Sequence, residues 1–267
     1  MKRIPLSLIG TCVLVLTLVF GLAGQASADG RDHRVIVTPD HPQGWSTADT
    51  RLGGTVTFVA DESAPAGRGA LQLTTDATTT AKAQYLHAAN TSIASVTDLS
   101  YYTKQNSAPF AGGDPAYQLA MFLNGSTGFS TLVFEPYQNP LQGAVVPNVW
   151  QRWDVAAGLF WSTRTVTCSA GTVAGTSGGP SSYTLAQINA LCPDAMVIGI
   201  GVNVGTNNPG YNVETDLFNF NGTVYDFEPA HTCAKDDDGD RSHDCGKAGH
   251  DDDDDGGDDA DADGGDD

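Results

Sequence analysis

The chain has 267 residues and a formal net charge of −19 at pH 7, an acidic balance that argues against a nucleic-acid partner, because phosphate backbones attract basic surfaces. Sixteen aspartates against Lys235, Arg241 and Lys247 place −13 of this charge in residues 233–267. A block of like charge with almost no apolar side chains cannot bury a core, so we predict that residues 231–267 form a disordered acidic tail.

The N-terminus has the three parts of an export signal. Lys2 and Arg3 precede an apolar run over residues 6–23, and the small residues Ala26-Ser27-Ala28 follow it. We therefore predict that residues 1–28 are a cleaved signal peptide and that the mature protein is secreted or held at the cell surface. A retained anchor is the alternative, because the run approaches the length that spans a bilayer. No other segment is apolar enough, so the mature chain is predicted to have no membrane span.

Residues 45–230 are predicted to form one all-β domain, an antiparallel jelly-roll sandwich, after a lead-in over residues 29–44. Short runs of alternating or β-branched residues recur between Gly, Pro, Asn and Asp turn signals, which is typical of such folds. The sharpest turn signal, Asn221-Gly222, predicts a tight hairpin. The predicted strands are 55–61, 69–75, 82–88, 98–104, 116–123, 130–137, 149–156, 197–205, 211–220 and 223–228.

One short helix is predicted over about 184–192. Thr184 and Gln187 form a capping box ahead of three spaced apolar residues, and Pro193 ends the helix. The stretch before it, residues 171–182, is rich in Gly, Ser and Thr and is predicted to be a loop.

Export also affects the interpretation of the cysteines. Four remain after the signal peptide, and an even number in an exported chain favours disulfides. Three connectivities are open, of which we favour the local pairs Cys168–Cys192 and Cys233–Cys245. A tetrahedral Zn²⁺ site from His231, Cys233, His243 and Cys245 ranks below the second pair, because cysteines pair in an oxidising compartment.

Five segments carry a resemblance to a known group of proteins: Gly69-Ala70-Leu71-Gln72-Leu73, Asp98-Leu99-Ser100-Tyr101-Tyr102-Thr103, Leu132-Val133-Phe134-Glu135-Pro136-Tyr137, Trp150-Gln151-Arg152-Trp153-Asp154 and Asn221-Gly222-Thr223-Val224-Tyr225-Asp226-Phe227-Glu228. Together they resemble secreted bacterial jelly-roll domains, similar in layout to concanavalin-like and carbohydrate-binding-module sandwiches. The resemblance covers about residues 45–230. It implies the fold and export, but that group has no assigned activity to carry over.

Strand alternation assigns side chains to faces, because successive residues point opposite ways. The residues predicted to face the core are Tyr117, Leu119, Met121, Leu123, Leu132, Phe134, Ile198, Ile200, Val202, Val204, Val213 and Leu217. Those predicted on the other face include Gly199, Gly201, Gly205, Ala120, Phe122, Val133, Asn212 and Asp216. Of the tryptophans, Trp153 is expected in the core, and Trp161 is the one expected to be exposed.

If these strands share one sheet, its outer face carries the predicted ligand-binding residues Gln118, Glu135, Tyr137, Asn203 and Glu214. Amides, carboxylates and an aromatic ring suit a sugar, and glycines let a ligand approach the backbone closely. The predicted partner is an extracellular polysaccharide. A solvated face, or one covered by the loop 171–182, is the alternative, because outward polar residues are usual on antiparallel sheets.

The enzyme alternative is a glycoside hydrolase using Glu135 and Glu214. Hydrolysis needs two carboxylates about 5–9 Å apart, a spacing that neighbouring strands would provide. Against it, no strand carries the dense acidic pattern expected of concanavalin-like hydrolases, and Glu135 before Pro136 is explained equally well by a strand end. We therefore favour a non-catalytic binding domain.

The start of the tail offers oxygen ligands for a cation. With Gly239 at the glycine position of a calcium loop, the expected metal ligands are Asp236, Asp238, Asp240 and Asp244. Ala234 and Cys245 stand where Asp and Glu are expected, so only weak Ca²⁺ binding is predicted. The alternative is a solubilising tail that collects divalent cations diffusely. A third class of function is thus a structural or surface protein with a weak Ca²⁺-binding tail.

Overall fold

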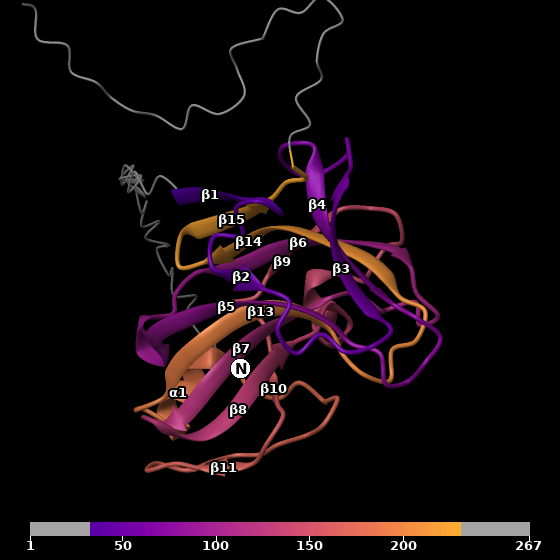
Figure 1. The fold of residues 1–267 in the computed structure, drawn as a ribbon. Coiled ribbons are helices and arrows are strands. Elements are labelled where there is room, and N and C mark those ends of the chain that lie inside the picture. Colours follow the sequence, from indigo (N-terminus) through magenta and orange to yellow (C-terminus); the bar gives the residue numbers. More distant parts are fainter. Residues whose placement is uncertain (1–32, 231–267) are drawn as a thin grey trace, which may run out of the picture. The chain divides into compact units, whose positions relative to one another are not determined.

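The computed structural model describes residues 33–230 (Figure 1). Several predictions lie outside these residues: the signal peptide 1–28, the acidic tail 231–267, the Cys233–Cys245 pair with its Zn²⁺ alternative, and the Ca²⁺ ligands Asp236, Asp238, Asp240 and Asp244.

The described residues form a β-sandwich of two principal sheets with one α-helix, as the sequence predicted (Figure 1). The seven-stranded sheet contains β9 (Gln151–Asp154), β6 (Leu99–Ser107), β14 (Asn212–Phe220), β4 (Gly69–Thr75), β3 (Gly54–Ala60), β15 (Thr223–Phe227) and β1 (His33–Val37). The six-stranded sheet runs in the order β10 (Trp161–Ser162), β8 (Thr127–Phe134), β7 (Ala116–Asn124), β13 (Met196–Val204), β5 (Ala83–Ser92) and β2 (Trp45–Ser46). The remaining elements are the β11 (Val166–Thr167) and β12 (Thr172–Val173) pair, α1 (Leu185–Leu191), and the 3₁₀ turns η1 (Ile93–Ser95), η2 (Pro136–Gln138) and η3 (Pro140–Gln142).

Each predicted strand has a counterpart, with ends shifted by a few residues. The Asn221-Gly222 hairpin joins β14 to β15, and both of its residues have positive φ, at 53° and 83°. β1 was not predicted as a strand: it lies in the expected lead-in and pairs in parallel with β15. The other strands missing from the prediction have only two residues each, too few to show alternation.

The core lies between the two sheets. Tyr117 from β7 stacks on Phe218 from β14 with ring centroids 4.1 Å apart, which joins the sheets at their centre. Trp153 is fully buried, as predicted. Burying an aromatic side chain of this size contributes about 1.5–3 kcal/mol, so each of these residues stabilises the sandwich.

Two face predictions are wrong where a strand is irregular. In β13 the pairing shifts between Val197 and Gly199, so that Val197 is buried in the core and Ile198 is only half-buried. In β14 the shift lies between Asp216 and Asn219 at Leu217, whose φ is 46°. Phe218 therefore occupies the core in place of Leu217, and Asp216 is buried where β14 changes partner from β4 to β15.

The helix and its covalent link are confirmed. Thr184 and Gln187 make both hydrogen bonds of the capping box at the start of α1, and Cys192 ends the helix. Cys192 forms a disulfide with Cys168, which follows β11. Between residues 33 and 230, no helix is long and apolar enough to cross a membrane.

Candidate functional site

A polar groove of about 340 Å³ lies at one end of the six-stranded sheet. The start of β7, the end of β8 and the end of β13 meet there, because these neighbours are antiparallel: Tyr117 pairs with Phe134, and Asn203 with Ala116. Four of the five predicted ligand-binding residues line this one groove, namely Gln118, Glu135, Tyr137 and Asn203. The fifth, Glu214, does not line it.

The amides come from outward positions of adjacent strands. Gln118 on β7 lies opposite Gly201, two residues before Asn203 on β13. The Asn203 side-chain nitrogen donates to Gln84 Oε1 at 3.0 Å, and Gln84 is itself buried. Asn203 is therefore held in one orientation, which leaves its carbonyl as a fixed acceptor at the groove.

Glu135 directly follows β8 and is held by two donors. Trp161 Nε1 donates to Glu135 Oε2 at 2.8 Å, and Gln138 Nε2 donates to the same oxygen. Burial raises the pKa of Glu135, and these hydrogen bonds oppose the rise. Pro136 begins η2 immediately after it and fixes the direction in which the chain leaves the strand. The carboxyl is thus oriented and partly desolvated, and residues 33–230 place no basic side chain in the groove to neutralise it.

Gln138 also anchors the loop that borders the groove. Its Oε1 accepts from Ser181 N at 2.6 Å, and its Nε2 lies 3.2 Å from Gly178 O. Ser177 and Gly178 are part of the groove wall. The Gly- and Ser-rich loop therefore forms one side of the groove and does not cover it.

Aromatic side chains form the rim. Phe110 and Tyr137 are 50% and 40% exposed and meet edge to face at 5.0 Å, and Trp161 is half-buried beside Glu135. The buried amide of Gln105 donates to the carbonyls of Ala111 and Gly113 and so fixes the turn that presents Phe110. Exposed aromatic rings on a fixed support offer flat apolar surfaces beside polar groups.

Asp114 adds a second carboxyl group. Thr103 Oγ1 accepts from Trp153 Nε1 at 2.7 Å and donates to Asp114 Oδ2, which links the core to the groove. Asp114 Oδ1 is buried and has no hydrogen-bond partner among residues 33–230. Burial raises the pKa of Asp114 to about 8. No signal in the sequence pointed to it, since Gly112-Gly113-Asp114-Pro115 had the composition of a turn.

The predicted bare glycine face is only partly open. A Cβ at Gly201 would lie 2.6 Å from the Leu86 side chain, and one at Gly199 would lie 3.4 Å from Ala120. Neighbouring side chains therefore fill the sheet surface along β13. Of the three glycines predicted on this face, only Gly205, at the end of the strand, lines the groove.

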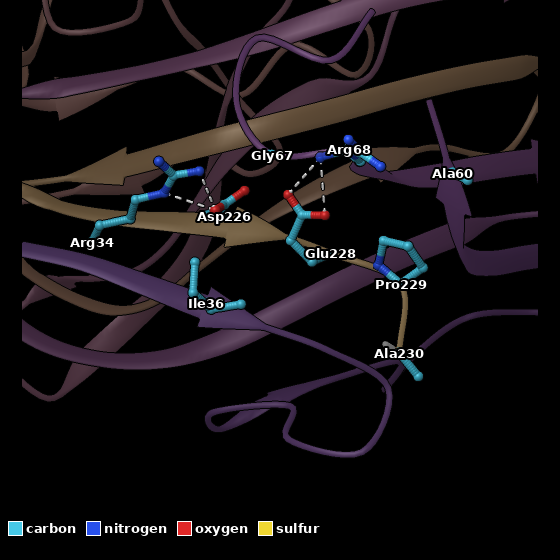
Figure 2. A pocket seen from close by; sticks show the side chains of 9 residues that line it. All are labelled: Arg34, Ile36, Ala60, Gly67, Arg68, Asp226, Glu228, Pro229 and Ala230. Atoms are coloured by element: carbon cyan, nitrogen blue, oxygen red, sulfur yellow. Dashed lines mark hydrogen bonds and ion pairs between the residues drawn. The ribbon is translucent and has the colours of Figure 1, made fainter. Parts of the chain in front are cut away.

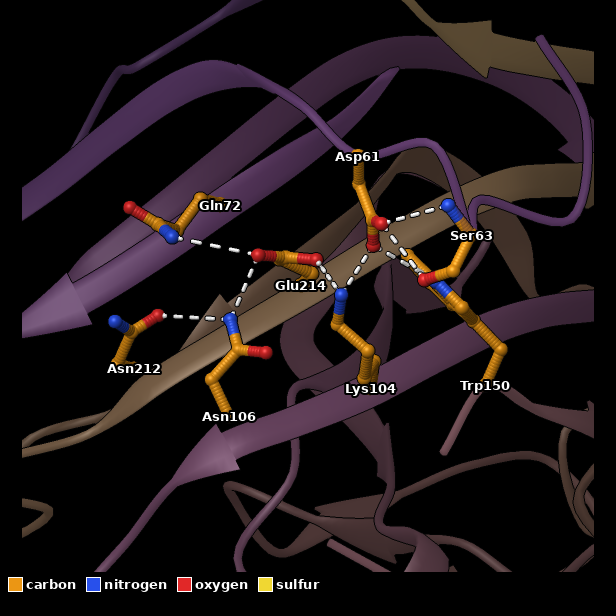
Figure 3. A network of polar contacts seen from close by, with 8 residues as sticks. All are labelled: Asp61, Ser63, Gln72, Lys104, Asn106, Trp150, Asn212 and Glu214. Carbon is orange, nitrogen blue, oxygen red and sulfur yellow. Dashed lines mark hydrogen bonds and ion pairs between the residues drawn. The ribbon is translucent and has the colours of Figure 1, made fainter. Parts of the chain in front are cut away.

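Glu214 belongs to the other sheet. It lies on β14 directly opposite Lys104 of β6, and Lys104 Nζ is 2.7 Å from Glu214 Oε2. Lys104 also pairs with Asp61, which accepts from Trp150 Nε1 at 3.0 Å (Figure 3). Burial acts to raise the pKa of Asp61, but hydrogen bonds from Lys104, Ser63 and Trp150 outweigh it and hold that pKa below its usual range. These partners make Glu214 part of a closed polar network on the seven-stranded sheet.

This placement corrects the proposed catalytic pair. Glu135 and Glu214 were expected on neighbouring strands, but β8 and β14 lie in different sheets. Packed sheets are about 10 Å apart, and both side chains belong to surfaces that face away from the core between them. The spacing that glycoside hydrolysis requires is therefore not provided by this pair.

A second hollow of about 580 Å³ lies beside β1 and β15 (Figure 2). Both of its carboxylates have a partner: Asp226 pairs with Arg34, and Glu228 accepts from the Arg68 backbone N–H. Ile36, Ala60 and Pro229 make the rest of its lining largely apolar. Across residues 33–230, no group of three or more His, Cys, Asp or Glu side chains is arranged to hold a metal ion.

No protein-family model matches the sequence, and no curated protein matches it. Solved structures to which the chain is similar include a family 11 carbohydrate-binding module from Clostridium thermocellum in complex with a β-1,3-1,4-mixed-linked tetrasaccharide. That match has 11% identity and a TM-score of 0.39, over 70% of this chain and 91% of that one. The xylan-binding domain of Xyn10C from Paenibacillus barcinonensis matches at 14% identity and a TM-score of 0.32, over 72% and 87%. The sandwich assignment itself rests on the strand pairing described above.

Proposed function

We propose that this chain is a secreted, non-catalytic glycan-binding domain whose site is the groove at the end of β7, β8 and β13. One observation supports the proposal: strands and loops distant in sequence bring amides, carboxyls and aromatic rings to one concave surface. Sugars present apolar ring faces edged by hydroxyl groups, so they are recognised by flat aromatic surfaces with fixed donors and acceptors beside them. The flat aromatic surfaces come from Phe110, Tyr137 and Trp161. The fixed donors and acceptors come from Gln118, Glu135 and Asn203.

Export is part of this proposal. The Cys168–Cys192 disulfide suits an oxidising compartment, as does the predicted signal peptide. The expected partner is accordingly a polysaccharide outside the cell.

The test is a glycan array probed with the mature chain, followed by titration of any ligand found. Glu135→Gln should weaken binding by about tenfold or more, because a hydrogen bond to a charged group contributes about 1.5–3 kcal/mol. Phe110→Ala should also weaken it. Phe129→Ala is the matched control, since Phe129 is a 38% exposed aromatic of β8 that lies outside the groove. Absence of binding to every glycan, or equal effects of the Phe110 and Phe129 variants, would contradict the proposal.

The alternative function is a structural or surface protein whose tail binds Ca²⁺ weakly. Repeating the array with and without Ca²⁺, beside a variant that ends at Ala230, separates the two. Glycan binding that survives removal of the tail favours the groove. Ca²⁺ binding that is lost with the tail, in the absence of any glycan binding, favours the structural role.

A further inference from the structure

The charge of the groove predicts the charge of the ligand that it binds. The described part of the chain lines it with two carboxyl groups, Asp114 and Glu135, and with no Lys, Arg or His side chain. Three other carboxylates of the sandwich with little exposed surface are paired with cations: Arg34 pairs with Asp226, and Lys104 with Asp61 and Glu214. Among residues 33–230, the half-buried acidic groups of the groove therefore have no positively charged side chain beside them.

The two carboxyls also have different hydrogen-bonding roles. Both donors to Glu135, Trp161 Nε1 and Gln138 Nε2, bind Oε2, which fixes the plane of the carboxyl. Asp114 is bound at Oδ2 by Thr103, while its Oδ1 has no partner among the described residues. Burial raises the pKa of both groups, as expected where negative charge is desolvated and uncompensated.

We infer that the groove selects uncharged glycans and rejects uronic-acid and sulfated ones, with Glu135 as the specificity-determining residue. This inference rests on the proposed glycan-binding function. A ligand hydroxyl donates a hydrogen bond to a carboxylate, whereas a ligand carboxylate or sulfate has no proton to donate and adds like charge in a partly desolvated site. Discrimination by such a repulsive element is a usual source of specificity.

The experiment uses the full mature chain and pairs of oligosaccharides that share a backbone. Three suitable pairs are methyl-esterified and de-esterified oligogalacturonides, cello-oligosaccharides and their C6-oxidised forms, and unsubstituted and glucuronic-acid-substituted xylo-oligosaccharides. Calorimetric titration at pH 7 should show at least tenfold weaker binding of the acidic member in every pair for which the neutral member binds.

Two variants distinguish an effect of the groove charge on glycan selectivity from an effect of the net charge of the protein. Glu135→Gln removes the negative charge of this carboxylate from the groove, so it should narrow the difference in affinity within a pair severalfold. Glu62→Gln removes one charge from an exposed residue outside the groove and should leave the difference unchanged. Raising the salt concentration screens long-range repulsion but should leave most of the discrimination, because the groove charges act at close range.

The outcomes are distinct. Equal or tighter binding of acidic members overturns the inference while the glycan-binding function stands. The inference also fails if Glu62→Gln narrows the difference as much as Glu135→Gln does, or if salt abolishes it. If no oligosaccharide of either kind binds, the proposed function itself fails.

Discussion

Asp216 and Asp226 are two carboxyl groups with no exposed surface, and they lie beside each other where β14 meets β15. Phe227 N donates to Asp216 Oδ1 at 3.0 Å, and Arg34 pairs with Asp226. Asp216 Oδ2 and Asp226 Oδ1 have no hydrogen-bond partner within residues 33–230. Burial, with a further contribution from Asp226, raises the pKa of Asp216 to about 8. This raised pKa favours the protonated form of Asp216 in the folded protein at neutral pH.

A pH dependence of stability follows from this raised pKa. Between the ordinary Asp value near 3.8 and about 8, the folded state holds a proton that the unfolded state has released. The free energy of unfolding should therefore fall as pH rises from about 4 to about 8. Asp114, with a pKa also about 8, acts in the same direction.

The variant Asp216→Asn isolates one of these groups. The amide keeps an acceptor for Phe227 N, never ionises, and offers a donor towards Asp226. We expect it to raise the free energy of unfolding at pH 8 by about 1–3 kcal/mol and to change it little at pH 4. Urea denaturation at the two pH values measures this, and an equal effect at both would contradict the assignment.

A second prediction at the residue scale concerns the contribution of Arg34 to stability. It is the cation that offsets buried Asp226, although its own side chain is 45% exposed (Figure 2). Arg34→Ala leaves that carboxylate unpaired, which should cost about 1–3 kcal/mol of stability, less than for a fully buried pair. Arg51→Ala is the control, because Arg51 is exposed and belongs to none of the ion pairs found between residues 33 and 230. Similar losses in both variants would contradict the role of Arg34.

At the scale of elements, α1 is held to the sandwich by two local devices. Its capping box satisfies the first backbone N–H groups, and its buried Leu185 and Ile188 belong to the core. The Cys168–Cys192 disulfide then ties its C-terminus to the segment after β11. The loop between these cysteines includes the groove wall at Ser177 and Gly178, so the same bond limits the freedom of that wall.

Removing the disulfide should therefore affect both stability and the groove. A loop of this length gives about 3 kcal/mol on the chain-entropy model, so Cys168→Ser with Cys192→Ser should lower the free energy of unfolding by about that amount. The same double variant should weaken ligand binding more than Thr184→Ala, which costs about 1 kcal/mol at the helix start and leaves the loop closed. Chemical denaturation of the native and double-variant proteins tests the first effect; an unchanged midpoint would contradict it.

At the scale of the whole molecule, the hydrophobic core is built from residues of the sandwich itself. Its members extend from Val37 on β1 to Phe227 on β15, and both sheets contribute to one continuous cluster. Stability should accordingly be a property of this part of the chain.

A chain ending at Ala230 tests that expectation. We expect its thermal midpoint to match that of the full mature chain within about 2 °C in the absence of Ca²⁺, because it keeps every core residue identified in 33–230. Calorimetry of the two proteins measures it. A large loss of stability would show that residues 231–267 pack on the sandwich.

The amino-acid sequence by itself determined the features that depend on near neighbours. The alternation of apolar and polar residues predicted the long strands. The tightest turn was predicted from Asn221-Gly222, and the start of the helix from Thr184 and Gln187. The predicted Cys168–Cys192 pair is formed, and the two cysteines lie 24 residues apart. For the site, alternation placed Gln118 and Asn203 on the outward face, and both line the groove.

Tertiary structure decided which strands are neighbours. Alternation fixes the face on which a side chain lies but carries no information about the sheet that a strand joins, because pairing depends on residues far along the chain. Because β14 belongs to the seven-stranded sheet and β8 to the six-stranded sheet, Glu214 does not lie beside Glu135. The same non-local pairing added β1 to the fold and placed Trp161 of β10 beside β8, while a loop brought Phe110 and Asp114 to the groove. Some residues of the groove could thus be predicted from the pattern of single strands. Which other residues line the groove was decided only by the assembly of the two sheets and their loops.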